Sequence, residues 1–170
     1  LINTIFILVV ISVITGILGD FPYYRFIDIP DRQLYLLFLH GMIFPIEITV
    51  IGFAIRDLFS GQVFTDDKLW GAGCIFLMIG ISFGSLYDLI CIARPGSLGE
   101  AIEPGLANYS VCMQYSLSVL GGMDPGYPNA SRLIRNISVI EAVWGNLFVV
   151  LIIGKLMGLP RPPKSETNQY

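Results

Sequence analysis

Long runs of apolar residues alternate with short polar connections along this chain. Four of these runs approach the length of about 20 residues that a helix needs to cross the hydrocarbon core of a bilayer. They cover residues 1–18, 34–55, 69–92 and 137–159. We therefore predict four transmembrane helices.

The connection between the third and fourth runs is much longer than the other two connections. Residues 93–105 are rich in glycine and proline, which is typical of a loop. Residues 106–120 are again apolar and aromatic, but a helix of this length would measure only about 22 Å, too short to cross a bilayer. A glycine-rich stretch, GGMDPG, follows at once.

This order predicts a half-helix that enters the membrane and a loop that returns, because irregular backbone is tolerated at membrane depth only where protein or water satisfies it. An interfacial helix followed by an ordinary turn outside the membrane is the alternative. The prediction is an all-α integral membrane protein with four transmembrane helices and a re-entrant helix and loop between the third and fourth. Its parts are a peripheral two-helix segment (1–68), a segment of outer helix, re-entrant hairpin and inner helix (69–159), and a polar, proline-rich tail (160–170).

Composition supports an integral membrane protein and argues against a nucleic-acid partner. Of the 170 residues, 54% are hydrophobic and 14% are charged, and the mean hydropathy is +0.70. The ten basic residues are scattered singly and the net charge is -3, so we expect no nucleic-acid partner. The three cysteines match no zinc or disulfide framework and are interpreted as packing thiols, with a pairing of Cys91 and Cys112 left open.

Basic residues give little information on orientation. The ten Lys and Arg residues divide evenly between the two sides of a four-helix topology. Every lysine falls on the side of the termini, which favours cytoplasmic termini in a plasma or inner membrane.

The segment from residue 69 to 158 resembles the pore module of potassium-channel-type proteins, which consists of an outer helix, a pore helix, a return loop and an inner helix. The stretch RLIRNISVIEAVWGNLFVVLIIGKLMG (132–158) is similar to the inner helix of that family. It has a basic residue at its outer end, Glu-Ala midway, and Gly145 where the gating hinge is expected.

The resemblance also assigns a selectivity filter, with the pore helix over residues 106–118. The residues aligned with the Thr-Val-Gly-Tyr-Gly-Asp filter of the family are Val119, Leu120, Gly121, Gly122, Met123 and Asp124. In such filters, backbone carbonyls from four chains replace the water shell of the ion. Because only the first glycine and the aspartate match, the resemblance implies a degenerate filter with altered or weak potassium selectivity. A left-handed backbone at Met123, which replaces the second glycine, would be strained.

Glu141 is an acidic residue inside the fourth span, where a carboxylate is costly without a partner or a function. The resemblance places it behind the pore helix, where it would brace that helix by accepting hydrogen bonds from Tyr115 or from serine hydroxyls. A position lining the ion path is the alternative.

Three polar residues of the second and third spans are further candidates. His40 and Glu47 share one helix face and could form a proton or metal relay, or hydrogen-bond to neighbouring helices. Asp88, near the outer end of the third span, is expected to be an interfacial acid. With a single histidine, the chain has too few ligands for a closed metal site, so we expect no metal and no cofactor.

The sequence contains no constellation of catalytic residues, and we predict that the protein is not an enzyme. The favoured function is a tetrameric cation channel that passes monovalent cations, with the bilayer and three further copies of the chain as partners. The alternative is a non-conducting structural or accessory subunit of a larger membrane complex. In that case its partners are other membrane subunits.

Overall fold

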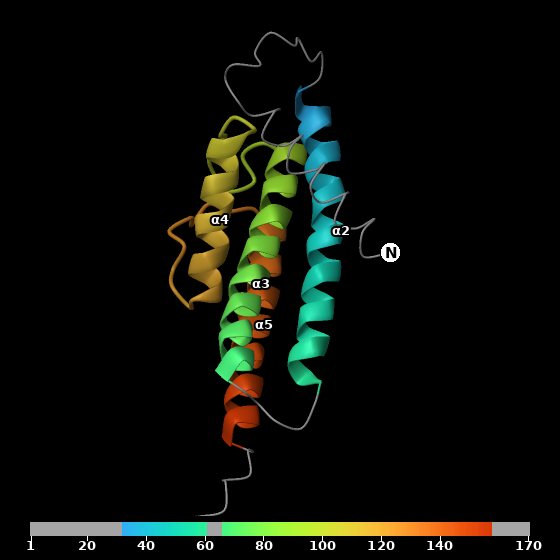
Figure 1. Cartoon of the computed structure of the whole chain (residues 1–170). Coiled ribbons are helices and arrows are strands. Elements are labelled where there is room, and N and C mark those ends of the chain that lie inside the picture. Colours follow the sequence, from blue (N-terminus) through green and yellow to red (C-terminus); the bar gives the residue numbers. More distant parts are fainter. Residues whose placement is uncertain (1–31, 61–65, 158–170) are drawn as a thin grey trace, which may run out of the picture.

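The computed structural model describes residues 32–60 and 66–157, and all regular secondary structure in these ranges is helical (Figure 1). The helices are α2 (Arg32–Phe59), α3 (Asp66–Ala93), α4 (Leu106–Leu120) and α5 (Arg132–Met157). The predicted span over residues 1–18 and the tail 160–170 lie outside the described residues. The helix predicted over 106–120 is present with the same bounds.

Three of these helices are long and apolar enough to cross a membrane. The candidate spans are Gln33–Phe59, Lys68–Ala93 and Arg132–Lys155, with mean hydropathies of 1.9, 2.0 and 2.1. The sequence predictions of these three helices and of a membrane protein are therefore supported by the structure. The fifteen-residue α4 is shorter than a span requires.

Helix α5 begins five residues before the apolar run that predicted it, because a capping residue sets the start. The Ile134 backbone N–H donates to the Ser131 hydroxyl oxygen over 3.4 Å. The Arg135 N–H donates to the Ser131 carbonyl over 3.0 Å. The Ser131 hydroxyl thus satisfies one of the amide groups that the first turn leaves without a partner, and its carbonyl accepts the first helical hydrogen bond.

Helix α3 is the centre of the bundle. Figure 1 shows α2 on one side of it, α4 on the other, and α5 behind it. One buried apolar cluster joins α2, α3 and α5, and includes Leu120 from the end of α4. A second cluster joins the last turns of α3 to α4 and the start of α5. The short helix is therefore packed into the bundle on two sides.

Glycines on α3 and α5 allow α4 to approach closely. A Cβ atom added to Gly84 would lie 2.9 Å from the Met113 sulfur and 3.1 Å from the Met113 Cα. A Cβ atom added to Gly145 would lie 2.7 Å from a methyl carbon of Leu120. Small residues at helix contacts are the usual means of close packing in membranes.

The connection from α4 to α5 returns toward the end of α3. Its last residue, Ser131, donates its N–H to the Ser97 carbonyl over 2.7 Å. Asn129 packs against Gly99, whose φ of 102° is readily accessible only to glycine. In Figure 1 this connection runs back alongside α4 before α5 begins. The start of α5 is thereby tied to the loop that follows α3.

Candidate functional site

The C-terminal end of α4 lies near the middle of both α3 and α5. Leu117 and Leu120 approach Gly80, which is near the middle of α3, and Leu120 also approaches Gly145, which is near the middle of α5. Gly145, the predicted hinge, is buried at this contact. A half-length helix thus ends midway along two helices that are long enough to span a membrane.

Glu141 is held between α3 and α4 by two hydroxyl groups. The Tyr87 hydroxyl donates to Glu141 Oε2 over 2.6 Å, and Ser116 Oγ contacts Glu141 Oε1. Ser116 Oγ also lies 2.6 Å from the Gly80 carbonyl oxygen. Tyr87, Ser116 and Glu141 are all 0% exposed. The carboxyl group therefore links α5 to both α3 and α4, on the side of α4 that faces the bundle.

Tyr115 lies beside this cluster and contributes by ring packing. Its ring meets that of Tyr87 edge-on, with centroids 5.0 Å apart, and that of Tyr127 at 5.8 Å. Tyr115 is 3% exposed. Edge-to-face aromatic pairs at these distances are favourable. The expected serine partner of Glu141 is present as Ser116, whereas Tyr87 was not predicted.

The segment aligned with a filter has a helical beginning and a turn at its end. Val119 and Leu120 form the last residues of α4 and are buried. The Gly122 N–H donates to the Val119 carbonyl over 3.0 Å, and the Met123 N–H donates to the Ser118 carbonyl over 2.8 Å. These two carbonyls therefore complete the helix end.

Gly122 takes the left-handed conformation in this segment, with φ of 70°. Among the described residues only glycines have a positive φ, so the strain expected at Met123 is absent. The Asp124 carboxylate accepts the Gly126 N–H over 2.9 Å and orders the next turn. From Gly121 to Asp124 the segment is exposed on this chain.

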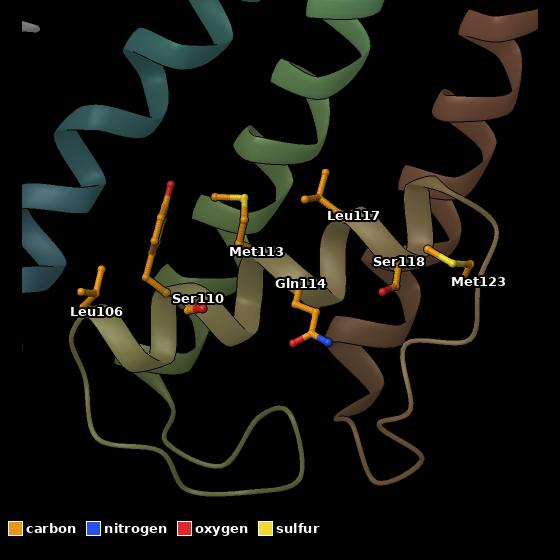
Figure 2. Close-up of a pocket in the computed structure, with 8 residues that line it drawn as sticks. Leu106, Ser110, Met113, Gln114, Leu117, Ser118 and Met123 are labelled. Carbon is orange, nitrogen blue, oxygen red and sulfur yellow. The ribbon is translucent and has the colours of Figure 1, made fainter.

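The outer face of α4 bears a polar stripe. Ser110, Gln114 and Ser118 recur every four residues, so they lie on one helix face. Figure 2 shows them along α4 beside Met113, Leu117 and Met123. Together these residues line an open cavity of about 670 Å³. Ser110 and Gln114 are exposed, and Ser118 is half-buried. This face therefore carries hydrogen-bonding groups on the side of α4 that is not covered by the rest of the chain.

A second polar cluster joins α2 to α3 and α4. The His40 ring nitrogen Nδ1 contacts the Asp88 carboxylate, and the Asn108 amide donates to the other Asp88 oxygen over 2.6 Å. Asp88 is 0% exposed. The carboxylate near the end of α3 is thus enclosed within the bundle, between His40 of α2 and Asn108 of α4.

His40 and Glu47 both face α3, as their shared helix face predicted, but they contact different residues. Glu47 Oε1 accepts a hydrogen bond from the Ser85 hydroxyl over 3.1 Å. Ser85 lies one turn of α3 before Asp88, which His40 contacts. Among residues 32–60 and 66–157, no group of three or more His, Cys, Asp or Glu side chains could hold a metal ion. The contacts are those of helix-to-helix hydrogen bonding.

The cysteines of the described helices are free thiols. Cys91 and Cys112 are both buried in the cluster between α3 and α4. Cys74 is exposed on α3.

Tyr87, Ser116 and Asn108 were not singled out from the sequence, although each holds a buried carboxylate. One signal was available: Glu141 and Asp88 are acids in apolar segments, and such acids need donors. Hydroxyl and amide side chains in the neighbouring helices were the candidates. Selecting among them requires the register of α3 against α4 and α5.

Comparison of the chain with models of protein families, with characterised proteins and with solved structures finds no match. The functional argument therefore rests on the residues and contacts described above.

Proposed function

We propose that this chain is one subunit of an oligomeric membrane protein that conducts monovalent cations, with α4 and the loop after it facing a shared aqueous path. The observation that carries the proposal is the polar stripe of Ser110, Gln114 and Ser118 on a helix that ends midway along two apolar ones. Facing lipid, the Gln114 amide would lack hydrogen-bond partners at a cost of several kcal/mol, whereas the serine hydroxyls could bond back to helix carbonyls. Further copies around a watery axis would supply them.

The electrostatics of the loop favour cations. The C-terminal end of α4 carries the negative end of the helix dipole, directed at the turn that starts at Gly121. Asp124 is exposed just beyond this turn, and the exposed acids Glu100 and Glu103 lie in the loop between α3 and α4. A fixed negative charge at a pore mouth raises the local cation concentration.

The same segment supports weak rather than high selectivity for potassium. High selectivity in potassium channels depends on carbonyl oxygens that replace the hydration shell of the ion. The carbonyls of Ser118 and Val119 accept hydrogen bonds from the turn, and Val119 and Leu120 pack inward. A hydrated cation passing the side chains of the polar stripe and Asp124 fits this arrangement better.

Flux measurements test the proposal. The full chain in liposomes is expected to pass K⁺ and Na⁺ with rates that differ by less than about tenfold. Asp124→Asn should lower the flux about twofold to fivefold at low ionic strength and less at high salt, because the charge that attracts cations is removed and screening is weaker at low salt. The asparagine oxygen can still accept the Gly126 N–H, so the turn is kept. Liposomes that pass no monovalent cation would overturn the proposal.

A second candidate function is that of a non-conducting subunit in a larger membrane assembly. The observation that favours it is the engagement of the Ser118 and Val119 carbonyls within the turn. Such a subunit would occur as a single copy in its complex, so the number of copies in mild detergent separates the two proposals.

A further inference from the structure

A cavity of about 310 Å³ lies between α2, α3 and α5, away from the exposed face of α4. Its wall is apolar apart from one residue and includes Ile51 and Gly52 of α2, Ile79 of α3 and Trp144 of α5. Its volume is at the lower end of the range for small-molecule sites.

The exception in the wall is Ser82. It is 2% exposed, and within the described part of the chain its hydroxyl oxygen has no hydrogen-bond partner. Serines in membrane helices often satisfy their hydroxyl by bonding the carbonyl one turn earlier, and this one does not. A buried hydroxyl left unpaired costs about 1–3 kcal/mol, so a partner in the cavity would be stabilising.

A second unpaired buried oxygen belongs to Glu47 of α2, which directly precedes Ile48 in the cavity wall. Glu47 Oε2 is buried and has no partner among the described residues, while Oε1 accepts the Ser85 hydroxyl. Ser85 is one turn of α3 from Ser82, and Glu47 is one turn of α2 from Ile51. The cavity therefore has a polar end near Ser82 and an apolar end near Ile79.

We propose that this cavity binds an apolar alcohol from the lipid phase, with its hydroxyl near Ser82 and Glu47 and its hydrocarbon part among the isoleucines and Trp144. A hydroxyl fits because it can both donate and accept. It can donate to a Glu47 carboxylate and accept from the Ser82 hydroxyl. With a protonated Glu47, it can accept from the acid and donate to Ser82. This site does not depend on whether the protein conducts ions.

Trp144 provides the readout for a test on the purified full chain. The chain has two tryptophans, and Trp70→Phe leaves Trp144 as the only one. The probes are a medium-chain alcohol with a terminal bromine, which quenches tryptophan fluorescence, and the bromoalkane of the same length. The alcohol is expected to quench Trp144 at a lower mole fraction than the alkane, by about threefold to tenfold, because one or two hydrogen bonds are added.

Two variants decide whether the quenching reports this site. Ser82→Ala should raise the mole fraction of alcohol needed for quenching to that needed for the alkane. Gly52→Leu should weaken quenching by the alcohol, because a Cβ at Gly52 meets no atom within 4 Å and the side chain would fill the cavity. Gly41→Leu is the matched control, on the same helix with equally open space but outside the cavity wall, and should change nothing.

Equal quenching by alcohol and alkane in the parent protein would mean that the cavity takes hydrocarbon without recognising a hydroxyl, and would overturn the proposal. Trp144 is 51% exposed, so quenching by the alcohol that Gly52→Leu leaves unchanged would show quenching from outside the cavity and would also overturn it. Conduction in liposomes is a separate measurement, so failure of one proposal leaves the other standing.

Discussion

At the scale of single residues, the buried carboxyl of Glu141 holds three helices together. One hydroxyl proton on Ser116 faces two acceptors, the Gly80 carbonyl and Glu141. A protonated Glu141 would resolve this conflict by donating to Ser116 while Ser116 donates to Gly80 and Tyr87 donates to the second carboxyl oxygen. A neutral acid also avoids the cost of a buried charge.

This arrangement predicts a large difference between two substitutions of Glu141. Glu141→Gln keeps an oxygen for Tyr87 and an N–H for Ser116, so it should change the free energy of unfolding by less than about 1 kcal/mol. Glu141→Ala leaves both hydroxyls unpaired and opens a cavity, so it should cost about 2–5 kcal/mol. Reversible unfolding in mixed detergent micelles measures both. Equal destabilisation by the two variants would mean that the negative charge itself is required.

At the scale of secondary-structure elements, the position of α4 depends on glycines in the helices that flank it. At Gly84 the nearest atoms include the backbone of Met113, which cannot move without shifting α4. At Gly145 the nearest atom is the end of the Leu120 side chain, which can change rotamer. Close approach is therefore more strictly required at Gly84 than at Gly145.

Alanine substitutions should separate these two contacts. Gly84→Ala is expected to cost about 1–3 kcal/mol of unfolding free energy through overpacking, and Gly145→Ala less than about 1 kcal/mol. Gly73→Ala is the control, because a Cβ there meets no atom within 4 Å, and it should be neutral or slightly stabilising. The same micelle unfolding assay applies. A Gly145→Ala variant less stable than Gly84→Ala would contradict the proposed packing of α4.

At the scale of the whole molecule, one chain leaves the polar face of α4 exposed. The opposite face of α4 is covered by α3 and α5, whose contacts include Glu141 and the two glycines. The exposed face bears Gln114 together with the serines of the stripe. An assembly that brings these faces toward a common axis would give them water or a neighbouring chain.

Cross-linking tests that arrangement. In a Cys74→Ser background, which removes the exposed native thiol, Gln114→Cys should form disulfide-linked dimers on mild oxidation in membranes. Val143→Cys is the control, since Val143 is 60% exposed on α5, away from the α4 face, and should remain monomeric. Cross-linking at 143 without cross-linking at 114 would place the assembly contact on α5 and refute an axis lined by α4.

The amino-acid sequence alone determined where the described helices lie and that three of them are long and apolar enough to cross a membrane. The bounds of α4 followed from its apolar run and the glycine turn, because helix formation and helix ends depend on neighbouring residues. The apolar run alone puts the start of α5 five residues too late, because Arg132 and Arg135 are polar, whereas the stretch compared with an inner helix, 132–158, begins where α5 begins. These are local properties, and the sequence carries them directly.

Only the tertiary structure decided which polar residues meet. Three examples depend on the register of one helix against another. Asp88 is buried with His40, Tyr87 rather than Tyr115 donates to Glu141, and Ser82 lines a cavity. Register is set by close packing of side chains at glycines such as Gly84. An apolar helix can pack in many registers that satisfy the same sequence pattern, so the pairs of residues in contact could not be derived from the pattern alone.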